Sequence, residues 1–184
     1  MDITPAQEKL LKALAVAIVD LPRGTFKDLA EAAGVSKATL NRFCGTREKL
    51  VEMLMDFSST VMNRVIASAG LVDSAPVDAL RTLTELHLTH RELLIFLIVQ
   101  WRRDALDEEA EDLRWKPYSD AMDAFFLRGQ AAGVFRIDVP APVLTELFAS
   151  ILFGLIDAER RGRIARSGMV TLVESSFLRG AVAR

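Results

Sequence analysis

Residues 24–50 read GTFKDLAEAAGVSKATLNRFCGTREKL, and this stretch decides the fold of the N-terminal part of the chain. Thr25 is a good N-cap for a short helix over residues 26–33, and Gly34 supplies the left-handed residue that ends such a helix. Ser36 then caps a second helix over residues 37–43. The pattern predicts two short helices that meet at a tight turn, which is a helix-turn-helix.

The second of these helices is expected to be exposed, polar and basic. Leu40 and Phe43 give it one apolar side, and the other side carries cations and hydrogen-bonding groups. In residues 23–49 the six Lys and Arg exceed the three Asp and Glu, although the net charge of the whole chain is only -2. The basic charge therefore lies where a helix would enter the major groove of DNA.

The same residues resemble the DNA-binding domain of TetR-family transcriptional regulators. The shared motif lies at residues 28–30 (DLA), 33–36 (AGVS), 39–40 (TL), Phe43 and residues 47–50 (REKL). Asn41 and Cys44 depart from it, since the family has an aromatic residue at each place. Similarity to efflux-operon repressors continues in residues 88–100 (LTHRELLIFLIVQ), 123–138 (DAFFLRGQAAGVFRID) and 157–163 (DAERRGR). The resemblance implies a dimeric repressor of a multidrug-efflux operon that also controls its own expression.

The candidate DNA contacts are cations, hydroxyls and one amide. Lys or Arg pairs with guanine acceptors, and Asn can bond adenine through two hydrogen bonds. The resemblance places Lys37 and Thr39 in the groove and Arg47 against the DNA backbone, while helix N-termini at Thr25 and Ser36 suit phosphates. The candidate residues are Thr25, Ser36, Lys37, Thr39, Asn41, Arg42 and Arg47. The alternative is a solvated basic face that binds nothing.

Helical periodicity continues along the rest of the chain, without a strand-period stretch longer than a few residues. We expect helices near residues 5–21, 47–69, 76–88, 90–106, 108–132 with a break near Pro117, 141–161 and 169–182. Thr89 and Glu92 are expected to form a capping box for the helix over residues 90–106. The fold class is all-α with about nine helices: a three-helix DNA-binding domain over residues 1–47 and a regulatory and dimerisation domain over residues 48–184.

Residues 141–161 are apolar around most of the expected helix, which therefore needs burial on more than one side. One side can face its own domain, and the other is expected to face a second copy, beside the last helix, where TetR-like proteins dimerise. The candidate interface residues are Leu144, Phe148, Ile151, Leu152, Leu155 and Phe177. The alternative is a central core helix in a monomer.

Aromatic and sulfur side chains are concentrated between residues 96 and 126, in the two helices that line the ligand cavity of TetR-like regulators. Such side chains suit a small flat ligand, apolar or cationic, through stacking and cation–π contact. The candidate pocket residues are Phe96, Trp101, Trp115, Tyr118, Met122, Phe125 and Phe126. Core packing explains the same residues equally well.

Other classes of function find little support. The sequence lacks a Ser/His/Asp or Cys/His set and a phosphate-binding glycine loop, so we expect no enzyme and no cofactor. His87 and His90 have no Cys or third His to complete a metal site. The lone Cys44 is expected to be a small core residue rather than a redox sensor, and a cytoplasmic location without a membrane span is expected. The alternative from another class is a helical small-molecule-binding or scaffolding protein that does not bind an operator.

Overall fold

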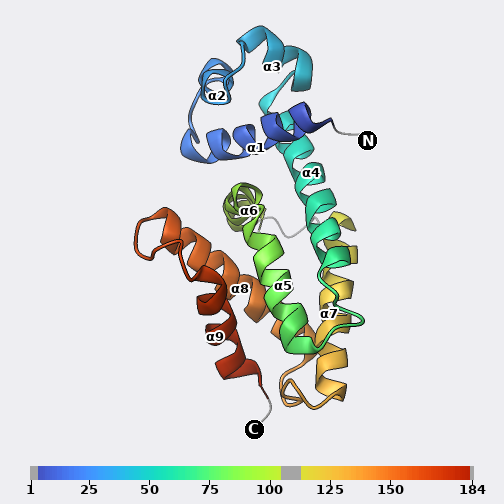
Figure 1. Cartoon of the computed structure of the whole chain (residues 1–184). Helices are drawn as coiled ribbons and strands as arrows, with labels where there is room; N and C mark the ends of the chain where they lie inside the picture. Colours follow the sequence, from blue (N-terminus) through green and yellow to red (C-terminus); the bar gives the residue numbers. More distant parts are fainter. Residues whose placement is uncertain (1–3, 105–112, 183–184) are drawn as a thin grey trace. The chain divides into compact units, whose positions relative to one another are not determined.

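The computed structural model describes residues 4–104 and 113–182. This part of the chain forms nine α-helices and no strand, which confirms the expected all-α class (Figure 1). The helices are α1 (Pro5–Asp20), α2 (Phe26–Ala32), α3 (Lys37–Cys44), α4 (Arg47–Ser68), α5 (Pro76–Leu88), α6 (Arg91–Asp104), α7 (Lys116–Ala131), α8 (Ala141–Arg160) and α9 (Met169–Ala181), with a 3₁₀ turn at Leu113–Trp115. The first residues of the helix expected over 108–132 lie outside the described residues.

The described residues divide into two compact units. The first unit holds residues 4–60 and 92–104, and the second holds residues 61–91 and 113–182. The helix α4 continues from the first unit into the second because no Pro or Gly interrupts it. This division differs from the boundary expected after residue 47, since α6 groups with the N-terminal helices.

Five phenylalanines form the centre of the core in the second unit. Each is at most 2% exposed, and neighbouring ring centroids lie 5.0 to 6.4 Å apart in tilted or edge-on pairs. Gly129 of α7 makes room for this cluster, because a Cβ atom there would lie 2.2 Å from the ring of Phe135. The cluster consists of Phe125 and Phe126 of α7, Phe135, Phe148 of α8 and Phe177 of α9.

The aromatic residues that the sequence offered as a ligand pocket are distributed differently. Met122, Phe125 and Phe126 are buried in the core of the second unit, which agrees with the core-packing alternative for these three. Phe96 is buried in the first unit, and the side chain of Trp101 lies outside the described part. Trp115 and Tyr118 remain partly exposed at the start of α7.

A hydrogen-bonded pair of one buried and one half-buried polar side chain joins α5 to α7 in the second unit. Nδ1 of His87 lies 2.8 Å from the carbonyl oxygen of Leu83, and Nε2 lies 2.8 Å from the hydroxyl of Tyr118. Because a carbonyl only accepts, Nδ1 carries the hydrogen and Nε2 accepts from the Tyr118 hydroxyl. Burial lowers the pKa of His87 to about 4 and raises the pKa of Tyr118, so both side chains are neutral. Both imidazole nitrogens are thus used within the chain, and neither is left for a metal ion.

Thr89 closes α5 instead of opening α6. Its hydroxyl donates to the carbonyl of Leu86 at 2.7 Å, and its amide bonds Glu85. The helix α6 begins at Arg91, which puts Thr89 one residue too early to be its N-cap. The capping box expected between Thr89 and Glu92 was therefore placed wrongly, because two helices follow each other here with almost no linker.

One stripe of α8 faces the core of its own unit. Leu144 and Phe148 are 0% exposed, and Leu152 is 1% exposed. Phe177 of α9 is also buried, at 2%. These four residues were expected at a dimer interface, and the structure corrects that expectation because their side chains are already covered within the chain.

A neighbouring stripe of α8, one residue earlier in the sequence and so about 100° around the helix, is apolar and open. Val143 is 44% exposed and Leu147 is 47% exposed, while Ile151 and Leu155 are half-buried. A Cβ atom on Gly154 would meet nothing within 4 Å. Among the described helices, α8 alone is long and apolar enough to cross a membrane by length and composition, with 33% of that stretch buried. Its packing against α7 and α9 is that of a core helix with one further face to cover.

Candidate nucleic-acid interface

The turn between α2 and α3 is closed by glycine and by a serine cap. Gly34 has φ +73°, and the amide of Val35 bonds the carbonyl of Ala30 at 2.9 Å. The hydroxyl of Ser36 accepts from the amide of Thr39 at 3.0 Å, which starts α3 immediately. Four residues therefore separate the two helices, as the helix-turn-helix pattern requires.

The inner side of α3 fixes its rotation about its axis. Leu40 is 0% exposed and Cys44, one helical turn later, is 6% exposed. Burial of these two side chains forces the opposite side of α3 into solvent. Burial also raises the pKa of the Cys44 thiol, which donates to the carbonyl of Leu40, so the core role expected for this cysteine agrees with its position.

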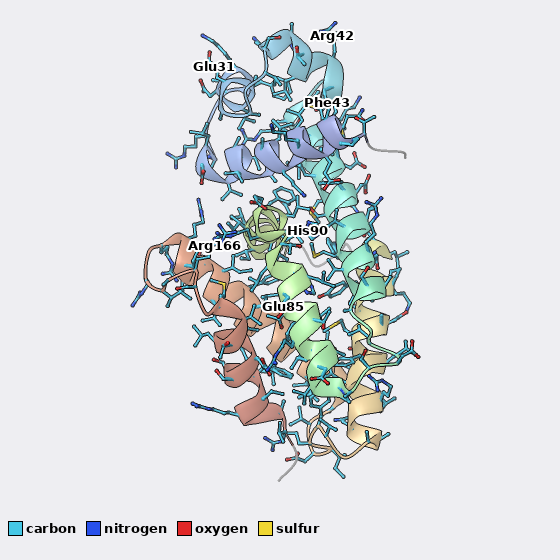
Figure 2. The ribbon with its side chains drawn as sticks, in the orientation of Figure 1. Glu31, Arg42, Phe43, Glu85, His90 and Arg166 are labelled. Carbon is cyan, nitrogen blue, oxygen red and sulfur yellow. The ribbon has the colours of Figure 1, made fainter. Side chains whose placement is uncertain are left out.

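The outer side of α3 is cationic and polar. Lys37, Asn41 and Arg42 are exposed, and α3 contains no acidic residue. Figure 2 labels Arg42 on this helix. Residues 37 and 41 are four apart, so the ammonium and the amide lie one turn apart on the same face. Ala38 is exposed between them and was not singled out from the sequence, since a methyl group carries no charge signal. This face has donors for bases and phosphates, with no carboxylate on α3 to repel them.

Ser36 and Thr39 lie together at the N-terminus of α3. Their hydroxyl oxygens are 2.9 Å apart. The amides of Lys37 and Ala38, at the very start of the helix, have no intrahelical acceptor by helix geometry. A phosphate at this end would meet amides, the positive end of the helix dipole and a hydroxyl.

The hydroxyl of Thr25 is occupied within the chain. It donates to a carboxylate oxygen of Asp28 at 2.8 Å and accepts from the amide of Asp28 at 3.3 Å. The backbone amide of Thr25 also donates to this carboxylate, at 2.7 Å, which completes the capping box that starts α2. This amide bond, together with the hydroxyl bond, lowers the pKa of the Asp28 carboxyl. Thr25 is therefore a capping residue of α2, and its contact with a DNA phosphate stays a prediction.

Arg47, expected at the DNA backbone, is also engaged within the chain. Its two terminal nitrogens donate to the carbonyls of Gly24 at 2.9 Å and Pro22 at 3.1 Å. The guanidinium thus fastens the start of α4 to the turn between α1 and α2. Arg47 thereby stabilises the packing of α4 against the turn that precedes the helix-turn-helix.

Comparison with known proteins identifies the class of regulator. No family model matches the sequence. Over 181 residues the chain is 57% identical to the HTH-type transcriptional regulator NfxB of Pseudomonas aeruginosa, and the match covers 98% of this chain and 97% of NfxB. The chain belongs to the NfxB family of helix-turn-helix transcriptional regulators.

Solved structures show the fold of this NfxB-family regulator. The TetR-like regulator LfrR of Mycobacterium smegmatis, in complex with proflavine, matches with a TM-score of 0.75 at 21% identity and covers 97% of both chains. The TetR-family regulator PfmR of Thermus thermophilus matches with a TM-score of 0.68 at 23% identity, covering 93% of this chain and 97% of PfmR. These structures confirm the TetR-like fold. Membership of the NfxB family makes the chain a DNA-binding transcriptional regulator and not an enzyme.

Proposed function

We propose that this NfxB-family regulator is a cytoplasmic homodimeric repressor that inserts α3 into the major groove of an operator. The observation that carries the proposal is the rotation of α3, which buries Leu40 and exposes Lys37, Asn41 and Arg42. The residues assigned to bases and phosphates are Lys37, Thr39, Asn41, Arg42 and the N-terminus of α3 at Ser36. We further propose that the operator controls a multidrug-efflux operon and the regulator's own gene, in line with the similarity to NfxB.

The dimer is proposed to form through the open stripe of α8. That stripe comprises Val143, Leu147, Ile151, Gly154 and Leu155, and Leu172 of α9 adds a side chain that is 38% exposed. Exposure of an apolar stripe of this kind to water is unfavourable, and packing against the same stripe of a second copy removes that surface from water. Two α3 helices related by a two-fold axis would contact half-sites about 34 to 36 Å apart, or a multiple of that spacing.

A small flat ligand remains part of the proposal. Trp115 and Tyr118 lie edge-on to one another with ring centroids 6.4 Å apart, and both keep an exposed rim. The complex of LfrR with proflavine, a related fold with a small molecule, supports a ligand that is apolar or cationic. Such a ligand would act by favouring a conformation with lower operator affinity.

The decisive experiment measures operator binding by the variant Lys37→Ala. DNA flanking the regulator's own gene, located by footprinting, serves as the probe in a titration followed by fluorescence anisotropy. We expect affinity to fall roughly tenfold, because the variant removes one charge-assisted hydrogen bond from each half-site. The dependence of the binding constant on salt should also weaken, by about one in slope for each phosphate that the missing ammonium would have neutralised.

Lys116→Ala is the matched control. Lys116 is an exposed lysine at the start of α7 whose ion pair with Asp120 is solvated, so its removal takes away the same charge without touching α3. Unchanged operator affinity in Lys37→Ala, or equal reductions in both variants, would contradict the proposal. Binding of promoter DNA that is absent, or insensitive to salt, would favour the small-molecule-binding or scaffolding alternative.

A further inference from the structure

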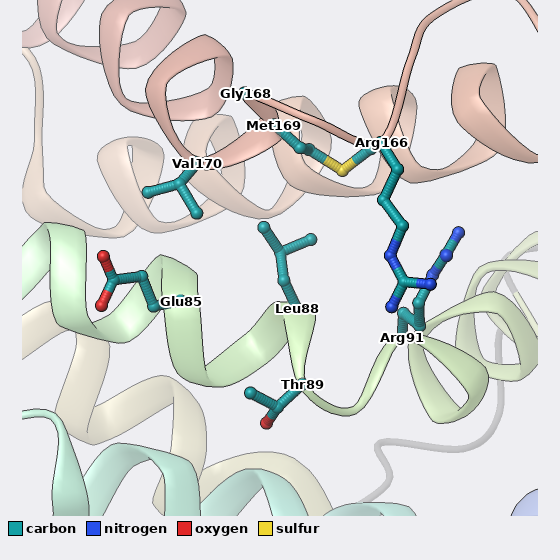
Figure 3. A pocket seen from close by; sticks show the side chains of 8 residues that line it. All are labelled: Glu85, Leu88, Thr89, Arg91, Arg166, Gly168, Met169 and Val170. Atoms are coloured by element: carbon teal, nitrogen blue, oxygen red, sulfur yellow. The ribbon is translucent and has the colours of Figure 1, made fainter.

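A pocket of about 380 Å³ lies in the second unit, away from the aromatic residues discussed above (Figure 3). Its walls come from the end of α5, from Arg91 at the first position of α6, from the loop after α8 and from the first turn of α9. The volume falls in the range that small-molecule sites use. None of the candidate aromatic pocket residues lines it, so it is a different place with a different chemistry.

One end of the pocket is cationic. Figure 3 draws the guanidinium groups of Arg91 and Arg166 at the same end of the pocket. Arg91 forms an ion pair with Glu159. Within the described residues, Arg166 has no carboxylate partner. Glu159 neutralises the charge of Arg91, so the uncompensated positive charge at this end of the pocket is that of Arg166. Guanidinium is the side chain best suited to hold a carboxylate through two hydrogen bonds.

The wall behind the arginines is apolar. Leu88, Met169 and Val170 line it, and Met169 is 5% exposed. Glu85 lies at the end opposite the arginines (Figure 3). A ligand with a second negative charge would meet Glu85, so the charges favour one anionic group at the arginine end and an uncharged apolar body beyond it.

The start of α9 adds to the positive field at the arginine end. Gly168 precedes the helix with φ +80°, and no side chain caps it. The amide of Met169 makes a long bond of 3.4 Å to the carbonyl of Arg166, and no side chain caps the amides that follow. The positive end of the helix dipole therefore lies in the pocket wall without an acidic side chain to offset it.

We propose that this pocket binds an amphipathic monoanion, a medium-chain carboxylate. The carboxylate lies against Arg166 and Arg91, and the alkyl body packs on Leu88, Met169 and Val170. Arg91 is also the last residue of the second unit before the chain enters the first, so an anion here contacts the chain at the point where the two units join in sequence. This site is independent of operator binding and stands or falls separately from it.

The test is isothermal titration calorimetry of the full chain with octanoate, acetate and 1-octanol. Octanoate is expected to bind, and acetate far less, because each methylene buried against the wall strengthens binding roughly threefold to fourfold. The alcohol keeps the apolar body but lacks the charge, so it should bind roughly tenfold or more weakly than octanoate.

Paired variants locate the site. Arg166→Gln should weaken octanoate binding roughly tenfold or more, whereas Arg163→Gln, an exposed arginine of the same loop outside the pocket, should leave it unchanged. Val170→Asn should weaken octanoate binding, and its exposed neighbour Thr171→Asn should not. Circular dichroism melts verify that each variant is folded.

Four outcomes would overturn the proposal: no binding of millimolar octanoate, acetate as strong as octanoate, 1-octanol as strong as octanoate, or equal octanoate binding by the Arg166→Gln and Arg163→Gln chains. None of these readouts involves DNA, so each leaves the operator assignment untouched.

Discussion

The guanidinium of Arg47 joins the start of α4 to the turn between α1 and α2, and both of its acceptors there are backbone carbonyls. Its bonds to the carbonyls of Gly24 and Pro22 satisfy two acceptors in a turn that has few amide donors of its own. Lysine also has several N–H donors, but they share a single nitrogen, so it lacks the planar fork whose two nitrogens reach the two carbonyls here. The family motif carries a cation at this position, and here that cation is a structural fastener.

Arg47→Ala should therefore destabilise the helix-turn-helix. Removal of two hydrogen bonds from a charged donor is expected to lower the free energy of unfolding by about 1 to 3 kcal/mol. Urea unfolding followed by circular dichroism measures the change. Arg23→Ala, which removes an exposed arginine from the same turn, is the control and should change stability little; equal effects of the two variants would contradict the fastener role.

His87 links stability to pH. Its pKa is about 4 in the folded chain, below the ordinary 6.5, so the unfolded chain binds a proton that the folded chain refuses between these values. Stability should therefore fall as the pH is lowered from 6.5 towards 4, by roughly 3 kcal/mol in total from this group, and the decrease should be complete below the folded pKa.

The variant His87→Gln tests this linkage, because glutamine stays neutral throughout that range. Urea unfolding at several pH values should give a flatter profile for His87→Gln than for the parent chain. A parent-like slope in His87→Gln would assign the pH dependence to other groups.

Single-residue chemistry was foreseeable from the sequence, but the partners of each group were not. The types at Thr25, Ser36 and Arg47 matched hydrogen-bonding roles, and the structure gives each of them bonds within the chain. The spacing of Thr25 and Asp28 already indicated a helix start, whereas the carbonyl partners of Arg47 are 23 and 25 residues away in sequence and carry no local signal. The sequence gives no signal that Arg166 and Arg91 line one pocket, because the two residues lie far apart in the chain and belong to no motif.

At the scale of elements, caps and breakers predicted helix ends well. The helix expected over residues 76–88 is α5, Pro76–Leu88, and the helix expected over 169–182 is α9, Met169–Ala181. Proline at the first position of α5 and glycine just before α9 are local signals of a helix start, and tertiary packing does not override them here. Thr89 failed as a predictor because a cap residue serves either the helix before it or the helix after it.

The close contact between α7 and Phe135 depends on Gly129. Gly129→Ala would place a methyl group 2.2 Å from a ring carbon of Phe135, so the ring must shift within the phenylalanine cluster. The expected cost is roughly 1 to 3 kcal/mol in the free energy of unfolding, measured by urea titration.

Gly180→Ala is the control for helix propensity. A Cβ atom there meets nothing within 4 Å, so alanine should be neutral or should stabilise α9 by up to about 1 kcal/mol. Equal effects at Gly129 and Gly180 would show that the close approach to Phe135 does not limit stability.

At the scale of the whole molecule, hydropathy indicated that α8 needs two apolar neighbours but could not say which stripe faces which neighbour. Leu144, Phe148 and Leu152 recur every four residues, and so do Val143, Leu147 and Ile151. Both sets are equally apolar in the sequence. Only the packing of α7 and α9 reveals that the first set is covered and the second is open.

The dimer prediction therefore rests on Leu147. Leu147→Asp should yield monomers in sedimentation equilibrium, because a carboxylate at an apolar interface loses its hydration without a partner. The fold should survive, since Leu147 is 47% exposed within its own chain. Phe148→Asp would be a poor test, because Phe148 is 0% exposed and its replacement would damage the core.

Leu127→Asp is the matched control for the same change of charge. Leu127 is an apolar residue of α7 that is 62% exposed and lies outside the α8 stripe. A dimer that persists in Leu147→Asp would place the interface elsewhere, and monomers from both variants would show that the effect is not specific to α8.

The solitary thiol of Cys44 gives this regulator a built-in reporter. Cys44 is the last residue of α3, its side chain is 6% exposed, and the chain contains no other cysteine, so a thiol-alkylating reagent can reach the protein only when α3 separates from its neighbours. The rate of labelling by a maleimide or iodoacetamide would then report how often the helix-turn-helix opens locally. A slower rate in the presence of operator DNA would report how long α3 stays bound in the groove.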